Sequence, residues 1–187
     1  MLINGDTGSR ISKFNSNSVD LIIADIPWDK DRQGNFTYPE LFAQFRRVLK
    51  PDHFCCVVVD TGSCISPFFE YSKSSAEFFQ LHELMVFIED GLNFGNILVL
   101  GDLDKSFIFP IRKVNYFIKP KGRHPNERDI NLFRSLIEAY TKEGDSVLDP
   151  FMGVGNCGIA CKELGRDFVG IEIDKDYFET AKESINS

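Results

Sequence analysis

Residues 146 to 155 read Ser146-Val147-Leu148-Asp149-Pro150-Phe151-Met152-Gly153-Val154-Gly155, an apolar strand pattern that ends in an acid and a glycine turn. A helical pattern follows, and a second apolar strand then runs to Glu172. The two glycines allow a tight turn and a close approach of the backbone to a ligand. The helix N-terminus behind the turn favours an anionic group. This order of acid, glycine turn, helix, strand and acid indicates a site for a nucleoside-bearing cofactor.

The spacing within the turn does not choose the nucleoside. Asp149 could take a cationic amine, and Glu172 could accept bonds from two ribose hydroxyls. Gly158 completes the pattern GxGxxG, which is typical of dinucleotide sites, so NAD and FAD stay open on spacing alone. A bare GxG is also compatible with a simple turn.

Apolar strand patterns alternate with helical patterns along the rest of the chain. Strands are predicted at residues 2–4, 19–24, 54–59, 83–89, 96–100, 114–118, 146–149 and 168–171. The pattern predicts a helix over 39–49 that Pro51 ends, one with a stripe from Leu132 to Tyr140, one that Gly165 ends, and one that Asp174 caps. This alternation predicts an α/β fold with a mostly parallel central sheet and helices on both faces.

Ligands of such sheets bind outside the carboxyl ends of the strands. That rule selects the residues that follow the predicted strands: Asp6, Asp25 to Trp28, Asp60, Asp149 to Gly155, and Glu172.

Size and composition predict one domain, spanning residues 1–187, with a packed core. The chain has 187 residues, 43% of them hydrophobic, and 18 phenylalanines. It shows neither a long apolar run nor a secretory pattern at the N-terminus, so we expect an intracellular, cytoplasmic protein, nucleoid-associated if it is bacterial or from a phage. The five cysteines include no CxxC pair and the three histidines add no suitable spacing, so we expect no metal site.

The charge is unevenly distributed. A net charge of −7 argues against a polyanionic partner. Between residues 105 and 128, however, one acid, Glu127, stands among seven basic residues: Lys105, Arg112, Lys113, Lys119, Lys121, Arg123 and Arg128. This basic run is either a solvated loop or an edge that faces phosphates.

Asp25-Ile26-Pro27-Trp28 follows a buried strand and suits chemistry on a planar amine, with Asp25 as an unpaired acid. The lone pair of an exocyclic amine is delocalised into its ring, so the nitrogen is a poor nucleophile. Asp25 and the backbone carbonyl of Ile26 can accept its two N–H bonds, which frees the lone pair and stabilises the positive charge that forms. Pro27 fixes the direction of the carbonyl, and Trp28 offers a face on which a flipped base can stack. Taken alone, the tetrapeptide favours a strand-to-loop turn with a packed Trp.

Over nearly its full length the chain resembles the amino-methylating DNA methyltransferases of the circularly permuted beta class. The segments that carry the resemblance are Asn4-Gly5-Asp6, Asn17 to Trp28, Arg47-Val48-Leu49-Lys50-Pro51, His124-Pro125-Asn126, Asp149 to Gly155 and Gly170-Ile171-Glu172-Ile173-Asp174. The resemblance implies a Rossmann-like fold that binds S-adenosylmethionine. It also implies a catalytic half, 1–123, that precedes a cofactor-binding half, 124–187.

The same resemblance assigns roles to residues. It implies a cofactor site made of Asp6, His124, Pro125, Asn126, Asp149, Phe151, Gly153, Gly155 and Glu172, with Asp6 on the cofactor's adenine amine. It implies a catalytic group made of Asp25, Ile26, Pro27 and Trp28. Family members with Asp at the first catalytic position mostly methylate adenine N6, whereas those that methylate cytosine N4 usually carry Ser there. The expected reaction is therefore methylation of adenine N6 in DNA.

Three departures from the family pattern keep alternatives open. Ile26 replaces the commoner Pro, Arg128-Asp129 stands where Lys-Pro is frequent, and residues 61–123 leave little room for a target-recognition domain. The enzyme would then be loosely specific, or its specificity would come from a homodimer or a protein partner. Candidate contacts to the nucleic-acid backbone are Arg112, Lys113, Lys119, Lys121 and Arg123. The alternatives are methylation of cytosine N4 in DNA, methylation of adenosine in RNA, and a catalytically silent subunit that acts as a scaffold.

Overall fold

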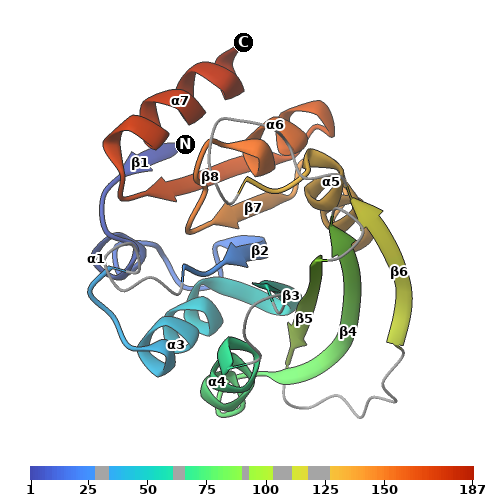
Figure 1. Cartoon of the computed structure of the whole chain (residues 1–187). Helices are drawn as coiled ribbons and strands as arrows, with labels where there is room; N and C mark the ends of the chain where they lie inside the picture. The colour runs from blue at the N-terminus through green and yellow to red at the C-terminus, as the bar shows by residue number, and fades with distance from the viewer. Residues whose placement is uncertain (28–33, 61–65, 90–92, 103–110, 118–126) are drawn as a thin grey trace.

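The computed structural model of the chain describes residues 1–27, 34–60, 66–89, 93–102, 111–117 and 127–187. Within these residues one eight-stranded sheet forms the centre of the molecule (Figure 1). Its strands, in order across the sheet, are β1 (Leu2–Asn4), β8 (Asp167–Glu172), β7 (Ser146–Asp149), β2 (Val19–Asp25), β3 (Leu49–Asp60), β5 (Asn93–Gly101), β4 (Gln80–Glu89) and β6 (Ile111–Phe117). β5 runs antiparallel to both of its neighbours, and every other pair is parallel. The prediction of a mostly parallel sheet is confirmed.

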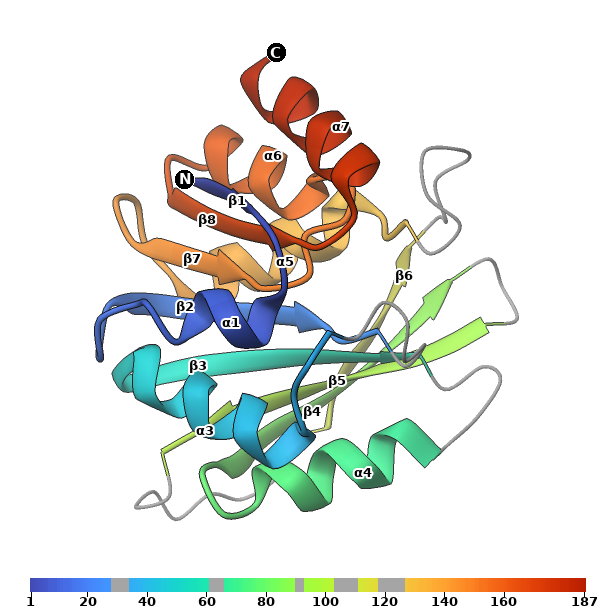
Figure 2. The same ribbon diagram turned by 90° about the vertical axis from the view of Figure 1, so that its left-hand side faces the viewer.

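Helices cover both faces of this sheet (Figure 2). One face carries α1 (Thr7–Ile11), α3 (Tyr38–Val48) and α4 (Ser66–Ser75). The other carries α5 (Ile130–Tyr140) and α6 (Asn156–Glu163), and α7 (Lys175–Asn186) packs on α6 and on β1 and β8. Among the described residues, none of the helices has the length and apolar character that a membrane span requires.

The inner part of β2 is apolar on both faces because successive residues enter opposite cores. In β2, Ile22 and Ala24 pack with α1, α3 and α4, whereas Leu21 and Ile23 pack with α5 and α6. All four side chains are fully buried. Side chains alternate between the two faces of a strand, so a strand covered on both faces reads as a continuous apolar run. The run at residues 19–24 therefore has a direct physical cause.

Polar residues fix the helix ends that the sequence indicated. Asp174 begins α7 by accepting bonds from the backbone N–H groups of Asp176 and Tyr177, as predicted. Thr37 and Glu40 form a reciprocal capping box at the start of α3. Gly165 adopts a left-handed conformation just after α6, with φ of 71°.

The predicted role of Pro51 is wrong. α3 ends at Val48 and β3 begins at Leu49, so Pro51 lies inside a strand. The pairing of β2 with β3 shifts register there, from Val19 opposite Leu49 to Leu21 opposite Phe54. A proline has no N–H to donate, and a bulge is one of the few places in a sheet that tolerates it.

Gly155 and Gly144 provide a matched test of the glycine turn. Both have a left-handed backbone, with φ of 90° and 83°, which costs a residue with a Cβ about 1–2 kcal/mol. A Cβ at Gly155 would also lie 3.0 Å from the Cβ of Ala181 in α7, whereas one at Gly144 would meet nothing within 4 Å. We expect Gly155→Ala to lower the free energy of unfolding by about 1–3 kcal/mol more than Gly144→Ala, because it adds overpacking to the backbone cost. Urea unfolding of both variants measures the difference, and equal losses would contradict the packing role.

Candidate functional site

Three carboxylates stand at the ends of three neighbouring strands. Asp25 ends β2, Asp149 ends β7 and Glu172 ends β8. β7 pairs in parallel with β2, through Leu148 opposite Ile22, and with β8, through Asp149 opposite Gly170. Because the three strands run the same way, their carboxyl ends meet at one edge of the sheet. This edge is the candidate site.

Glu172 ties the glycine turn to the end of β8. One carboxylate oxygen accepts a hydrogen bond from the backbone N–H of Gly153 at 2.8 Å, and the other accepts one from Asp174 at 2.8 Å. Glu172 is only 9% exposed. Burial raises the pKa of this carboxyl, although the two backbone hydrogen bonds act in the opposite direction. The acid therefore holds the turn in shape as well as facing the site edge.

Asp149 is the most deeply buried acid of the three. It is 3% exposed and accepts a bond from the backbone N–H of Phe151 at 3.0 Å. Burial raises its pKa to about 8, the bond from Phe151 opposes the rise, and the neighbouring charges of Asp25 and Glu172 add to it. The thiol of Cys157, at the start of α6, donates to the same carboxylate. A buried acid with this pKa favours a cation placed beside it.

Asp25 is not the unpaired acid that the sequence suggested. The guanidinium of Arg128 binds it, with 2.8 Å from Nε to Oδ2 and 3.4 Å from Nη2 to Oδ1. The Arg128 side chain is 7% exposed and that of Asp25 is 26% exposed. The two residues lie 103 positions apart in the chain, so no local pattern could have indicated the pair.

Asn156, the first residue of α6, holds the segment that carries Arg128. Its side-chain amide donates to the backbone carbonyl of Arg128 at 2.8 Å and to the carboxylate of Glu127 at 3.0 Å. Asn156 is buried and follows the glycine turn directly. A continuous set of bonds therefore runs from the glycine turn to Asp25.

The carbonyl of Ile26 also has a partner that sequence reasoning missed. The hydroxyl of Tyr71, in α4, donates to it at 3.1 Å, and both residues are buried. Burial and the neighbouring Tyr38 raise the pKa of Tyr71, so the hydroxyl remains a donor. Pro27 follows in the chain, and Trp28 lies outside the described residues. The structure thus fixes the direction of the Ile26 carbonyl through a helix that the sequence did not reveal.

The N-terminal segment closes the other side of the glycine turn. The hydroxyl of Thr7 donates to the carbonyl of Pro150, and the Asn4 amide donates to the carbonyl of Glu172. The Asp6 carboxylate caps α1 through the N–H of Ser9 and accepts a second bond from the N–H of Asn35, both at 2.9 Å. Phe151 packs against Phe36, with ring centres 5.9 Å apart. Asp6 and Phe151 thus both contact the segment at Asn35 and Phe36 that precedes α3.

The remaining predicted site residues either lie outside the described residues or have only their backbone described. His124, Pro125, Asn126, Lys119, Lys121 and Arg123 lie outside the described residues. Arg112 and Lys113 are described only by their backbone, in β6. Within the described part of the chain there is no group of three or more His, Cys, Asp or Glu residues that could hold a metal ion.

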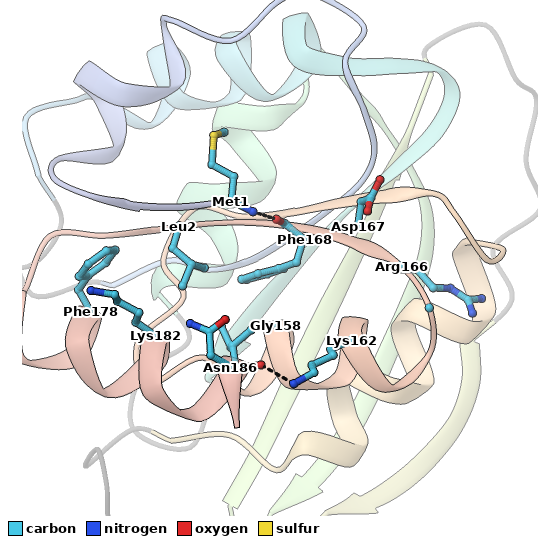
Figure 3. Close-up of a pocket in the computed structure, with 12 residues that line it drawn as sticks. Met1, Leu2, Gly158, Lys162, Arg166, Asp167, Phe168, Phe178, Lys182 and Asn186 are labelled. Carbon is cyan, nitrogen blue, oxygen red and sulfur yellow. Dashed lines mark hydrogen bonds between the residues drawn. The ribbon is translucent and has the colours of Figure 1, made fainter.

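A cavity of about 770 Å³ lies at the opposite end of the strands (Figure 3). It is lined by the start of β1 and β8 and by parts of α6 and α7, including Lys162, Arg166 and Lys182. Lys162 donates to the carbonyl of Ile185 at 3.0 Å, and Arg166 donates to Thr141 and Leu164. Lys182 pairs with the carboxylate of Glu179 at 3.3 Å, so these basic groups are all bound within the protein, and the cavity takes no part in the candidate site.

Comparison with solved structures supports the same architecture. The S-adenosylmethionine complex of M1.HpyAVI superposes with a TM-score of 0.79 at 25% identity, over 100% of this chain and 99% of that one. The PvuII DNA methyltransferase, which is cytosine-N4-specific, superposes with a TM-score of 0.78 at 16% identity, over 97% and 84% of the two chains. The predicted α/β fold of S-adenosylmethionine-dependent methyltransferases is confirmed.

Sequence comparison identifies the family. The Type II methyltransferase M.HpaI of Haemophilus parainfluenzae is 40% identical over 82 residues, which are 44% of this chain. The match spans only about a quarter of that relative, 26% of its length. The model of the DNA methylase family, which groups N6 and N4 amino-methyltransferases, matches residues 89–183, slightly more than half of the chain. The chain therefore belongs to the N6/N4 DNA methylase family.

Proposed function

We propose that the protein transfers a methyl group from S-adenosylmethionine to the exocyclic amine of a base in DNA, and that the base is adenine, methylated at N6. One observation carries the proposal. Asp25 ends β2, which pairs in parallel with β7 through Ile22 opposite Leu148, so Asp25 lies at the same edge of the sheet as the glycine turn that follows β7. An amine bound to Asp25 would therefore lie beside a cofactor bound at the turn.

The residues at the turn fit this cofactor. S-adenosylmethionine carries a sulfonium and an amine, both cationic, and Asp149 is a buried acid with a pKa that a nearby cation would lower. Glu172 stands at the end of the next strand, where ribose hydroxyls could reach its carboxylate. The bound cofactor would supply an electrophilic methyl group. The complex of M1.HpyAVI with S-adenosylmethionine supports this choice.

Asp25 and Ile26 prepare the amine. Each accepts one N–H bond from the amine, which draws the nitrogen toward tetrahedral geometry and stabilises the positive charge formed as the nitrogen takes the methyl group. The sulfur of the cofactor would leave as a neutral thioether, and the methylated nitrogen would lose one proton to water. A carbonyl oxygen has two lone pairs, so the bond from Tyr71 leaves one for the substrate at Ile26. Pro27 stiffens the turn, and we assign to Trp28 the face on which the flipped base stacks.

The choice of adenine rests on Asp25. In the family that the chain resembles, members with Asp at this position mostly methylate adenine N6, and those that methylate cytosine N4 usually carry Ser there. The choice of DNA rests on the family and on M.HpaI, a Type II methyltransferase. We assign the contacts to the DNA backbone to the five candidates of the basic run, Arg112, Lys113, Lys119, Lys121 and Arg123, and sequence specificity to a second copy or a protein partner.

The role of Asp25 is tested by Asp25→Asn. We expect transfer of tritiated methyl groups to DNA to fall about a hundredfold or more, because one of the two acceptors that stabilise the developing charge is weakened. Calorimetry should show that the variant still binds the cofactor. Asp167→Asn is the matched control, because Asp167 is exposed at the opposite end of β8. Unchanged transfer in Asp25→Asn would refute the role.

The base is tested by chromatography of DNA hydrolysed after the reaction. We expect N6-methyladenine, and we expect unlabelled DNA to compete for the methyl label better than RNA of the same sequence. N4-methylcytosine as the product would keep the site and refute the choice of base. Better competition by RNA would refute the choice of DNA.

Asp149 makes cofactor binding depend on pH. The cationic amine requires the ionised carboxylate, and the Asp149 pKa of about 8 leaves it largely protonated below that value. Binding should therefore release a proton, and the Kd should fall as pH rises from about 6 to about 7.5, by up to about tenfold per pH unit. Calorimetry in buffers of different ionisation enthalpy measures the release. Asp149→Asn should bind more weakly and lose the pH dependence, and a flat Kd in the wild type would contradict the role.

A further inference from the structure

The bonds that join the glycine turn to Asp25 lead to a role for Arg128. We propose that Arg128 is a positioning residue, which fixes the Asp25 carboxylate in the orientation that receives the amine and is itself held in place by Asn156 beside the cofactor turn. The inference rests on the proposed function and names a residue on which that reaction depends.

The contacts favour orientation over simple charge balance. Two different nitrogens of Arg128 approach the two oxygens of Asp25, at 2.8 Å and 3.4 Å. A planar guanidinium that contacts both oxygens fixes the plane of the carboxylate, which a single point charge does not. Each carboxylate oxygen has further lone pairs, so Asp25 can accept from the amine while the pair remains intact.

The position of Arg128 is itself set from the cofactor side. Asn156 donates to the Arg128 carbonyl at 2.8 Å, and Asn156 directly follows Gly155. Both Arg128 and Asn156 are buried, with exposures of 7%. A buried side chain held through its own backbone has few alternative positions. Asp25 lies near the N-terminus, whereas the glycine turn spans residues 149–155. This link therefore aligns two parts of the site that are far apart in the sequence.

The mechanism needs such alignment. Asp25 is 26% exposed and stands at the end of its strand, where its side chain has room to rotate. Rotation would move the acceptor away from the N–H bond that it accepts, and the amine would then lose its alignment with the methyl group. Misplacement of a reacting group by about 1 Å can reduce a rate about a hundredfold. Arg128 therefore acts through Asp25.

The test compares two variants with a matched control. Arg128→Met removes both bonds but keeps much of the bulk, and Arg128→Lys keeps the charge but contacts one point at a time. Arg134→Met is the control, because Arg134 pairs at 2.6 Å with Glu163 in an exposed position. We expect Arg128→Met to lower kcat about a hundredfold, and Arg128→Lys to recover only part of it. Arg134→Met should keep the wild-type kcat.

Calorimetry separates this role from a loss of folding. We expect Arg128→Met to bind S-adenosylmethionine with a stoichiometry near one and a Kd within about threefold of the wild type, so that the loss lies in kcat. A wild-type kcat in either Arg128 variant would overturn the inference and leave the proposed function standing. The inference would also be overturned if the loss of kcat only matched the fraction of protein that no longer binds the cofactor. A wild type that transfers no methyl group to DNA would overturn the proposed function, and the inference with it.

Discussion

The parallel pairing of β2, β7 and β8 is the constraint on which the candidate site depends. Asp25, Asp149 and Glu172 are distant in the sequence, and each simply ends a strand. They become neighbours because the three strands point the same way and pair side by side. Parallel strands require crossover connections, and the helices that make them bury both faces of the sheet. The same hydrophobic burial that stabilises the fold therefore brings the acids together.

Three acids at one edge repel one another, and the protein compensates each of them differently. Glu172 accepts two backbone N–H bonds, and Asp25 pairs with a guanidinium. Asp149 receives a backbone N–H and a weak thiol donor, and these do not offset the burial that raises its pKa. A buried acid in this state gains more from a bound cation than an acid that already has a strong partner. The uneven compensation thus favours cation binding at the glycine turn rather than at Asp25.

Strands and helices with a strong hydrophobic pattern could be predicted from the sequence because their burial is regular. The 19–24 run is apolar except at Asp20 because both faces of β2 are covered, and the stripe in α5 packs against that same sheet. α1 has only five residues, which is too few for a helical hydrophobic period to appear. Pro51 lies where the pairing of β2 with β3 shifts register, and a single sequence contains no sign of such a shift. The partners of the site were equally hidden. Tyr71 and Ile26 are 45 positions apart and Arg128 and Asp25 are 103 apart, so these contacts arise only once the sheet has formed.

The two sequence halves, 1–123 and 124–187, are not two spatial halves. β1, from the N-terminus, pairs with β8 near the C-terminus, with Asn4 opposite Glu172. The hydroxyl of Thr7 then bonds the carbonyl of Pro150 inside the glycine turn. The first residues of the chain therefore contact the glycine turn, which belongs to the second sequence half. Arg128, from the second half, in turn pairs with Asp25 from the first. Neither half by itself contains the whole candidate site, so the proposed cofactor binding and base activation depend on the same folded sheet.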